Sequence, residues 1–219
     1  MADTLRKIYL YTRFERFWHW LQMVLIGILL LTGFEIHGAY TLFGFEKAVE
    51  IHNFCGQAWL VLFVFILFWL ATTGQWKQYT PTTKKLFAVI RYYASGIFKG
   101  EPHPVSKCVE AKHNPLQRLT YLGITAVLLP LQMVTGLLYW MYNDWAVWGL
   151  SFLGLSFIAL LHTLLAFAIL IFVVVHVYMT STGHTITAHL AAMFSGWEEV
   201  DETCEVQEWE RRGDRKPAA

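Results

Sequence analysis

The sequence predicts an all-α integral membrane protein, a four-helix bundle, on three observations. Of its 219 residues, 56% are hydrophobic and only 15% are charged, whereas a soluble domain usually carries about 25% charged residues. Four apolar stretches are each long enough for a helix to cross a bilayer core of about 30 Å. Lysines and arginines gather in alternate connecting segments. These features exclude a soluble domain.

The four expected spans are residues 17–34, 51–73, 119–142 and 150–180. The first is expected to be a retained membrane helix rather than a signal peptide, because its apolar run is long and no A-x-A-like cleavage site follows it. The fourth is longer than a perpendicular crossing requires, so we expect it to tilt or to project beyond the bilayer.

The distribution of positive charge predicts the orientation of the bundle. Sixteen of the seventeen lysines and arginines lie before the first span, between the second and third, or after the fourth. Basic residues are retained on the cytoplasmic side. We therefore expect a multi-pass protein of the bacterial inner membrane with both termini in the cytoplasm.

Two cytoplasmic segments have a recognisable composition. Between the second and third spans, residues 84–99 alternate apolar and basic side chains at helical spacing. This predicts an amphipathic helix, lying either on the inner membrane surface or against the protein. The last part of the chain is acidic with a basic end, typical of a solvated tail or a docking strip. The expected domains are a membrane domain, 1–182, and a cytoplasmic tail, 183–219. Nothing predicts nucleic-acid binding.

Four of the nine histidines fall in or at the edge of spans, where ionisable side chains are costly and usually functional. His162 and His176 are fourteen residues apart in the fourth span, so they share a face to within about 40° and lie about 21 Å apart. His19 opens the first span on the cytoplasmic side, and His52 opens the second on the outer side. Depth therefore pairs His19 with His176 and His52 with His162.

Two such pairs stacked across a membrane predict two b haems, because neutral imidazole is a suitable axial ligand of haem iron. No C-x-x-C-H motif is present for covalent attachment. His37 competes as a ligand because it shares the helix face of His19, but its distance of about 27 Å from that residue does not match the spacing in the fourth span. Gly33 and Gly136 either leave room for a flat macrocycle or serve ordinary helix packing.

The motifs that carry these residues resemble one family. They are R-F-E-R-F-W-H-W at 13–20, I-H-N-F-C-G at 51–56, T-G-Q-W-K-Q-Y-T-P at 73–81, and the histidines of the fourth span. To about residue 182, the chain is similar to the bacterial dihaem cytochrome b subunits that anchor formate dehydrogenase, nickel–iron hydrogenase and thiosulfate reductase complexes. The resemblance implies the same ligand pairing and a quinone site near the cytoplasmic haem.

In that family the quinone lies beside an Asn-x-x-Gln-Lys/Arg stretch, which here reads H-N-P-L-Q-R at 113–118. A menaquinone or ubiquinone would be bound by the polar side chains of this stretch, His113, Asn114, Gln117 and Arg118. The same residues also fit an ordinary helix start, with Asn114 as the N-cap and Pro115 at the first position. Both interpretations can hold together.

One further side chain is a candidate for cofactor binding. Arg16 precedes His19 by one helical turn, where it can pair with a haem propionate. Alternatively, it only contributes to membrane topology.

The expected function is transmembrane electron transfer between membrane quinone and an outer partner. The partner is expected to be a periplasmic subunit with iron–sulfur clusters or c-type haems, together with its catalytic subunit, because the chain has no substrate-oxidising site beyond the quinone site. Two alternatives stay open: a histidine-relay proton channel or transporter, and a membrane anchor without cofactors. The channel is less favoured because the four spans show no inverted repeat.

Overall fold

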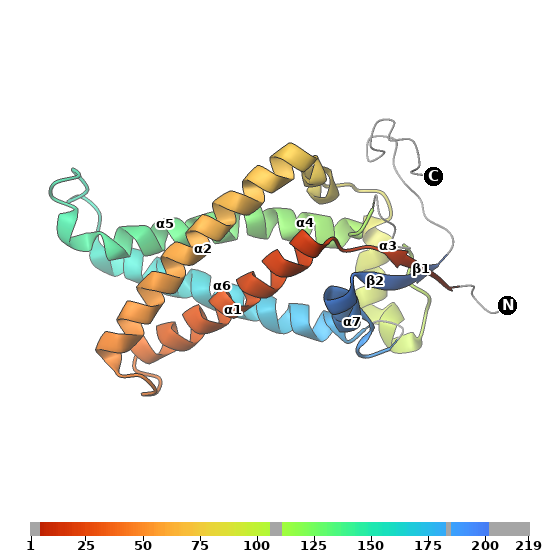
Figure 1. Ribbon diagram of the computed structural model, residues 1–219, viewed down its shortest axis with the longest axis horizontal. Coiled ribbons are helices and arrows are strands. Elements are labelled where there is room, and N and C mark those ends of the chain that lie inside the picture. Colours follow the sequence, from red (N-terminus) through yellow and green to blue (C-terminus); the bar gives the residue numbers. More distant parts are fainter. Residues whose placement is uncertain (1–4, 106–110, 183–184, 202–219) are drawn as a thin grey trace.

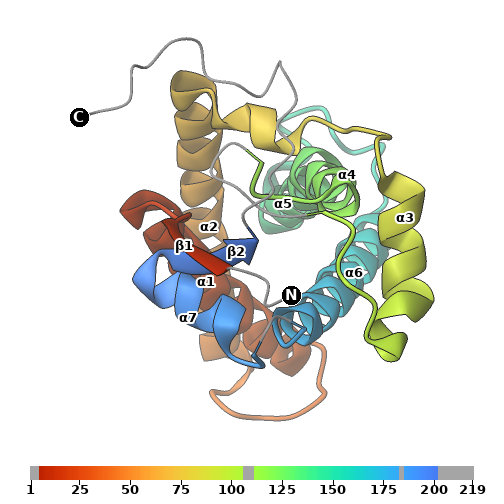
Figure 2. The same cartoon turned by 90° about the vertical axis from the view of Figure 1, so that its right-hand side faces the viewer.

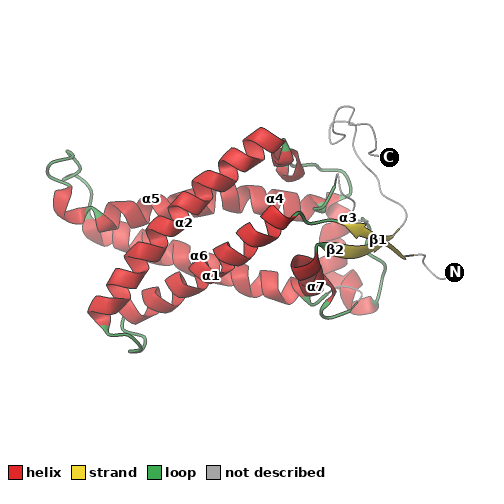
Figure 3. Cartoon of the chain, in the orientation of Figure 1, coloured by secondary structure: helices red, strands yellow, loops and turns green. Residues whose placement is uncertain are grey.

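The computed structural model describes residues 5–105, 111–182 and 185–201, and it confirms the helical membrane bundle (Figures 1 and 3). Its four long helical segments are α1 (Arg13–Ile36), α2 (Phe45–Thr73), α4 with α5 (Pro115–Gly123 and Leu129–Trp140), and α6 (Leu155–Thr180). They contain 24, 29, 26 and 26 residues. At about 1.5 Å per residue, each exceeds the thickness of a bilayer core.

The helices begin where the sequence satisfies their first N–H groups. Thr12 and Glu15 form a capping box at the start of α1, and Asn114 and Gln117 form another at the start of α4. Each box satisfies two backbone donors that have no intrahelical partner. The start of α4 is therefore the ordinary capped helix that the sequence allowed.

The third span contains a local irregularity. A π-helical turn, Ile124–Leu128, joins α4 to α5, and Pro130 follows it. Proline has no N–H for the i→i−4 bond and its ring clashes with the preceding turn, which favours a local change of helical pitch. This turn was not expected from the sequence.

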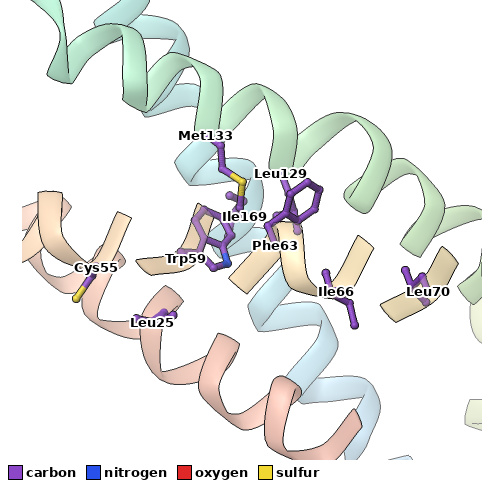
Figure 4. Packing of buried hydrophobic residues seen from close by; sticks show 9 residues of the cluster. All are labelled: Leu25, Cys55, Trp59, Phe63, Ile66, Leu70, Leu129, Met133 and Ile169. Atoms are coloured by element: carbon purple, nitrogen blue, oxygen red, sulfur yellow. The ribbon is translucent and has the colours of Figure 1, made fainter. Parts of the chain in front are cut away.

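The core of the bundle lies near its middle, where α1, α2, α5 and α6 meet (Figure 4). Trp59, Phe63, Met133 and Ile169 are buried there. Ile169 is seven residues from His162 and seven from His176, so this apolar layer lies between the two histidine depths. Elsewhere the helices expose large apolar side chains, among them Phe54, Phe68, Phe157, Ile171 and Val174, as a lipid-facing surface requires.

One end of the molecule, here called the loop end, contains the connections 37–44 and 141–154 (Figure 1). Glu35 organises the first connection, because its Oε1 accepts N–H bonds from Leu42, Phe43 and Gly44 at 2.7, 2.7 and 2.8 Å. Gly44 has φ 87°, which other residues rarely adopt. These bonds fix the chain just before α2.

The opposite end, here called the terminal end, contains the first and last described residues (Figure 2). Strands β1 (Leu5–Tyr9) and β2 (Trp197–Asp201) pair antiparallel, with Leu5 opposite Asp201. Helix α7 (Ala188–Ser195) leads into β2. Residues 185–201 are part of the expected cytoplasmic tail, whose acidic portion was expected to be solvated or to form a docking strip. In the structure they are folded onto the N-terminal segment.

The predicted amphipathic segment also lies at the terminal end. It comprises α3 (Leu86–Arg91), a π-helical turn (Tyr92–Gly96) and a 3₁₀ turn (Ile97–Lys99). Val89 is completely buried, whereas Phe87 is 81% and Phe98 75% exposed. The segment therefore packs on the protein through one face and leaves apolar side chains on another.

Candidate functional site

At the terminal end, His19 of α1 faces His176 of α6. Their ring centres are 6.1 Å apart, with an angle of 50° between the planes. Phe172, one turn before His176, stacks on its ring at 5.5 Å. Nδ1 of His19 is buried and has no hydrogen-bond partner among the described residues. The two rings are partly buried, so this pair stands in a largely apolar environment.

At the loop end, His52 of α2 faces His162 of α6. Their ring centres are 6.4 Å apart, with an angle of 73° between the planes. The structure therefore brings together the same two pairs that helix depth predicted. His37 lies nearby, since its Nε2 is 3.2 Å from the hydroxyl of Thr163, but His52 is the residue whose ring is opposite His162.

Two threonines orient the loop-end pair. The hydroxyl of Thr32 is 2.9 Å from Nδ1 of His52 and donates its own proton to the Ile28 carbonyl at 2.8 Å. Thr135 is likewise 3.0 Å from Nδ1 of His162 and donates to the Leu131 carbonyl at 2.8 Å. Because each hydroxyl proton is already used, each Nδ1 must donate, which leaves Nε2 of each ring with a free lone pair.

The residue after each threonine is a glycine that lies against the same imidazole. A Cβ atom on Gly33 would be 3.4 Å from Cε1 of His52, and one on Gly136 would be 3.1 Å from Cε1 of His162. The two glycines therefore let the rings lie directly on the neighbouring helix. They serve imidazole packing as well as helix packing, whereas a Cβ on Gly123 would meet nothing within 4 Å.

Gln132 adds a third polar group to the loop-end pair. Its side-chain nitrogen lies 3.1 Å from Nε2 and 3.3 Å from Nδ1 of His162. Its Oε1 is buried and has no partner in the described part of the chain. The amide of Gln132 thus lies where a metal ion bound to Nε2 of His162 would be. The Gln132 side chain would have to turn aside for such an ion to bind.

The dimensions of both pairs fit axial ligation of one metal ion. An imidazole nitrogen binds a transition metal at about 2.0–2.1 Å and lies about 1.1 Å from its ring centre, so two rings on opposite sides of an ion have centres about 6.3 Å apart. The observed 6.1 and 6.4 Å agree with this distance. In residues 5–105, 111–182 and 185–201 no group of three or more metal-ligating side chains occurs. Two facing imidazoles with no further protein ligand suit a haem, because its macrocycle supplies the other ligands.

The predicted quinone-binding stretch lies at the terminal end. Asn114 and Arg118 are only 6% and 3% exposed, and Nε of Arg118 donates to the His113 carbonyl at 2.9 Å. Gln117 is engaged in the capping box with Asn114, at 2.9 and 3.0 Å. The stretch is therefore a partly buried polar group of fixed conformation.

A row of aromatic rings joins this stretch to the terminal-end histidines. The ring of His113 is 5.0 Å from that of Tyr121, which is 6.5 Å from Phe172, which in turn stacks on His176. All these distances are between ring centres. The polar stretch and the histidine pair are thus neighbouring parts of one site.

Arg16, the residue predicted to pair with a haem propionate, contacts other segments of the terminal end. Its guanidinium donates to the Phe194 carbonyl of α7 and lies 3.4 Å from the hydroxyl of Tyr9. Its Nε is buried and makes no hydrogen bond within the described residues. In this structure Arg16 connects α1 to α7 and to β1 at the terminal end.

Sequence reasoning missed Thr32, Thr135 and Gln132. A signal for the threonines was present, because a Thr-Gly dipeptide occurs inside the first span at 32–33 and inside the third at 135–136. Threonine inside a membrane helix usually bonds to the carbonyl one turn earlier. Only the helix arrangement shows that each oxygen also faces a histidine.

Comparisons with known proteins find a family and a relative for this chain. The family model described as prokaryotic cytochrome b561 matches residues 10–196, which include all four spans and both histidine pairs. The cytochrome YdhU of Escherichia coli (strain K12) is 33% identical over 142 residues, which are 63% of this chain and 54% of that protein. The chain thus spans about half the length of this curated relative. No solved structure matches significantly.

Proposed function

Because the chain belongs to the prokaryotic cytochrome b561 family and is a membrane protein of haem b electron transfer, we propose that it carries two b haems and links membrane quinone to a redox partner. His19 and His176 hold one haem at the terminal end. His52 and His162 hold the other at the loop end. Haem b supplies reversible one-electron exchange at its iron.

The observation that carries this proposal is the similar separation of the rings in the two pairs, 6.1 and 6.4 Å between ring centres, with one histidine of each pair on α6. His162 and His176 place the two sites about 21 Å apart along α6. Between them the chain provides an apolar layer that excludes water. The protein thus holds two redox groups in series across the membrane.

The side chains around each pair have distinct tasks. Thr32 and Thr135 hold the loop-end rings in the tautomer whose Nε2 carries the lone pair for iron, and Gln132 would turn away from Nε2 of His162 when the haem is bound. Such outer-sphere hydrogen bonds orient a ligand and raise its basicity. Phe172 packs on His176 and restricts its ring at the other site.

The quinone, a menaquinone or ubiquinone, is proposed to bind at the terminal end beside residues 113–118. The aromatic row from His113 through Tyr121 and Phe172 to His176 supports this location, because it keeps the polar stretch within a few side chains of the haem ligand. Buried amide and guanidinium groups provide the hydrogen-bond donors that quinone carbonyls accept.

The proposed orientation places the terminal end in the cytoplasm and the loop end in the periplasm of a bacterial inner membrane. The distribution of lysine and arginine supports it. A periplasmic subunit with iron–sulfur clusters or c-type haems, and its catalytic subunit, would then exchange electrons at the loop-end haem. Electron transfer between the two sides moves charge worth about 2.3 kcal/mol per 100 mV.

The haem assignment is tested on the purified protein and four single variants. We expect two b haems in the wild type, loss of the loop-end haem in His52→Ala and His162→Ala, and loss of the terminal-end haem in His19→Ala and His176→Ala. The haem content of each protein gives the number of haems, and a redox titration identifies which of the two has been lost. A wild type without a reduced-minus-oxidised haem signal would favour the channel or the anchor, and loss of a haem in His37→Ala but not in His52→Ala would refute the pairing.

The quinone assignment is tested separately, with Asn114→Leu and Gln117→Leu. Loss of such a hydrogen bond costs about 1–3 kcal/mol, so quinol-driven haem reduction should slow while both haems stay bound. Leu119→Ala, a change of an exposed apolar residue on the same helix, is the control. Normal quinone kinetics in both polar variants would place the site elsewhere.

A further inference from the structure

We propose that Tyr93 and His103 form a proton relay for the quinone oxygen that is bound at Asn114. This inference rests on the proposed quinone site at the terminal end. It concerns residues of the connection between the second and third spans, which the sequence analysis did not assign to the site.

The relay is a continuous chain of hydrogen bonds. Nδ2 of Asn114 donates to the hydroxyl of Tyr93 at 3.2 Å, and this hydroxyl is 3.3 Å from Nε2 of His103. Asn114 is buried, whereas Tyr93 and His103 are partly exposed. The chain therefore runs from the buried polar stretch towards the surface.

The other contacts of the end residues fix its direction. Oδ1 of Asn114 accepts the N–H of Gln117 at 2.9 Å, so the amide nitrogen is the atom that faces Tyr93. Nδ1 of His103 lies 2.6 Å from the Val105 carbonyl, which can only accept, and 3.2 Å from the Val105 N–H, which can only donate. The shorter contact favours the neutral tautomer with the proton on Nδ1, and in that tautomer Nε2 accepts from Tyr93. Every donor in the chain points from Asn114 towards His103.

The local fold holds these groups in place. Tyr93 lies in the π-helical turn Tyr92–Gly96, and the chain folds back so that Glu101 N–H donates to the Gly96 carbonyl at 3.1 Å. The rings of Tyr92 and Tyr93 contact His103 edge-on, with centres 4.8 and 5.7 Å away. A π-helical turn is often found at functional sites.

A proton relay requires that the tyrosine hydroxyl stays protonated at rest, so that it can donate its proton as it accepts another. Burial raises the pKa of Tyr93, although its hydrogen bond with Asn114 acts in the opposite direction. The phenol is therefore neutral at physiological pH. It can accept a proton on its oxygen while it gives its own to His103.

The proton balance of one quinone oxygen can be written for quinol oxidation. The quinol O–H bond breaks, its proton goes to the oxygen of Tyr93, and the former Tyr93 proton goes to Nε2 of His103. One electron leaves with this proton to oxidised haem b, the acceptor named by the proposed function. The second quinol oxygen gives its proton to water, and the second electron goes to the same haem after it has been reoxidised. The imidazolium then releases a proton to water, and quinone reduction uses the same steps in reverse.

The test compares Tyr93→Phe and His103→Gln in the two-haem protein with the control His189→Gln, a histidine of the same end that pairs with Glu198 at 2.9 Å. Haem reduction by tetramethyl-hydroquinone and by menadiol is followed by stopped flow, and reduction by dithionite monitors the haems themselves. Acid–base catalysis contributes about 10²–10⁴-fold, so both relay variants should be slowed at least about 100-fold with the quinols and not with dithionite.

A second measurement does not depend on turnover. Infrared difference spectra of the quinone-loaded protein, recorded between electrochemically poised oxidised and reduced states, should contain histidine and tyrosine bands that Tyr93→Phe and His103→Gln remove. Imidazole added to His103→Ala should restore part of the quinol rate. Unchanged quinol rates and spectra in both relay variants would overturn the relay. If neither quinol reduces the haems of the wild-type protein, the quinone site itself would be refuted.

Discussion

The hydroxyl of Thr32 accepts a hydrogen bond from Nδ1 of His52 at 2.9 Å while it donates to the carbonyl of its own helix. Thr135 has the same relationship to His162. A threonine that uses its only proton locally becomes an acceptor for a neighbouring helix. Helices α1 and α5, which carry neither of the loop-end histidines, therefore orient the two imidazoles at that end.

The first prediction concerns these threonines. Thr32→Val or Thr135→Val keeps the shape of the side chain but removes the acceptor for Nδ1. Loss of such a partner typically costs about 10–100-fold in metal affinity or activity. We expect weaker binding of the loop-end haem, measured by haem titration of the apoprotein and by the potential of each haem, with the terminal-end haem unchanged.

Thr32→Ser, which retains the hydroxyl, is the matched control and should bind haem like the wild type. If the valine and serine variants bind both haems equally well, the threonines do not orient the ligands.

The second prediction concerns Gly136, whose added Cβ would be 3.1 Å from Cε1 of His162. Gly136→Ala should displace this ring, since overpacking costs about 1–3 kcal/mol. The loop-end haem should bind more weakly and its absorption band should shift. Gly123→Ala is the control, because a Cβ there meets nothing within 4 Å. Equal spectra for the two variants would show that Gly136 is not needed for the ring position.

The third prediction concerns the pH dependence of the terminal end. Burial, and after it the nearby Glu198 carboxylate, raises the pKa of Tyr11 well above its usual 10.0. The folded state then binds this proton more tightly than the unfolded state. The stabilisation is complete below about pH 10 and is lost above it, by up to about 1.4 kcal/mol per pH unit. The thermal unfolding midpoint should therefore fall between pH 10 and 11.

Tyr11→Phe removes this group and should show a smaller fall of the unfolding midpoint over the same interval. Burial also raises the pKa of Tyr79, so some dependence on pH should remain. Parallel pH curves for the variant and the wild type would argue against the effect of Tyr11.

The fourth prediction concerns orientation. Green fluorescent protein, which folds in the cytoplasm, should be fluorescent when fused after Ala219 and dark when inserted near Glu46. The reason is the retention of basic segments on the cytoplasmic side. The reverse result would place the quinone site and the proposed relay at the periplasmic face.

The spans and the two histidine pairs could be predicted from sequence because both follow from helix geometry and bilayer thickness. His162 and His176 needed only their spacing, and His19 and His52 only their depth. Strand β1 could not be predicted, because five residues carry little local signal and its partner is about 190 residues away. The acidic composition of residues 197–201 favoured a solvated tail, whereas tertiary pairing buries Glu198 and Val200.

The polar contacts were outside the reach of sequence reasoning for a similar reason. Thr32 and Thr135 face histidines of other helices. Tyr93, which lies in a π-helical turn, accepts a hydrogen bond from Asn114, 21 residues later in the chain. Spacing within a helix gives the face of a side chain but not the neighbour that this face meets.

The pairing of β1 with β2 also sets an order of events during biosynthesis. A ribosome adds about 5–20 residues per second, so β1 emerges about 10–40 s before residue 201 has been added. During this time the first span is inserted into the membrane. Ile8 and Leu10, which β2 later helps to bury, remain exposed until residue 201 has been added. The contacts of Arg16 with Tyr9 and with the Phe194 carbonyl therefore become complete only late in translation, so the terminal end takes its final form after the four spans have been made.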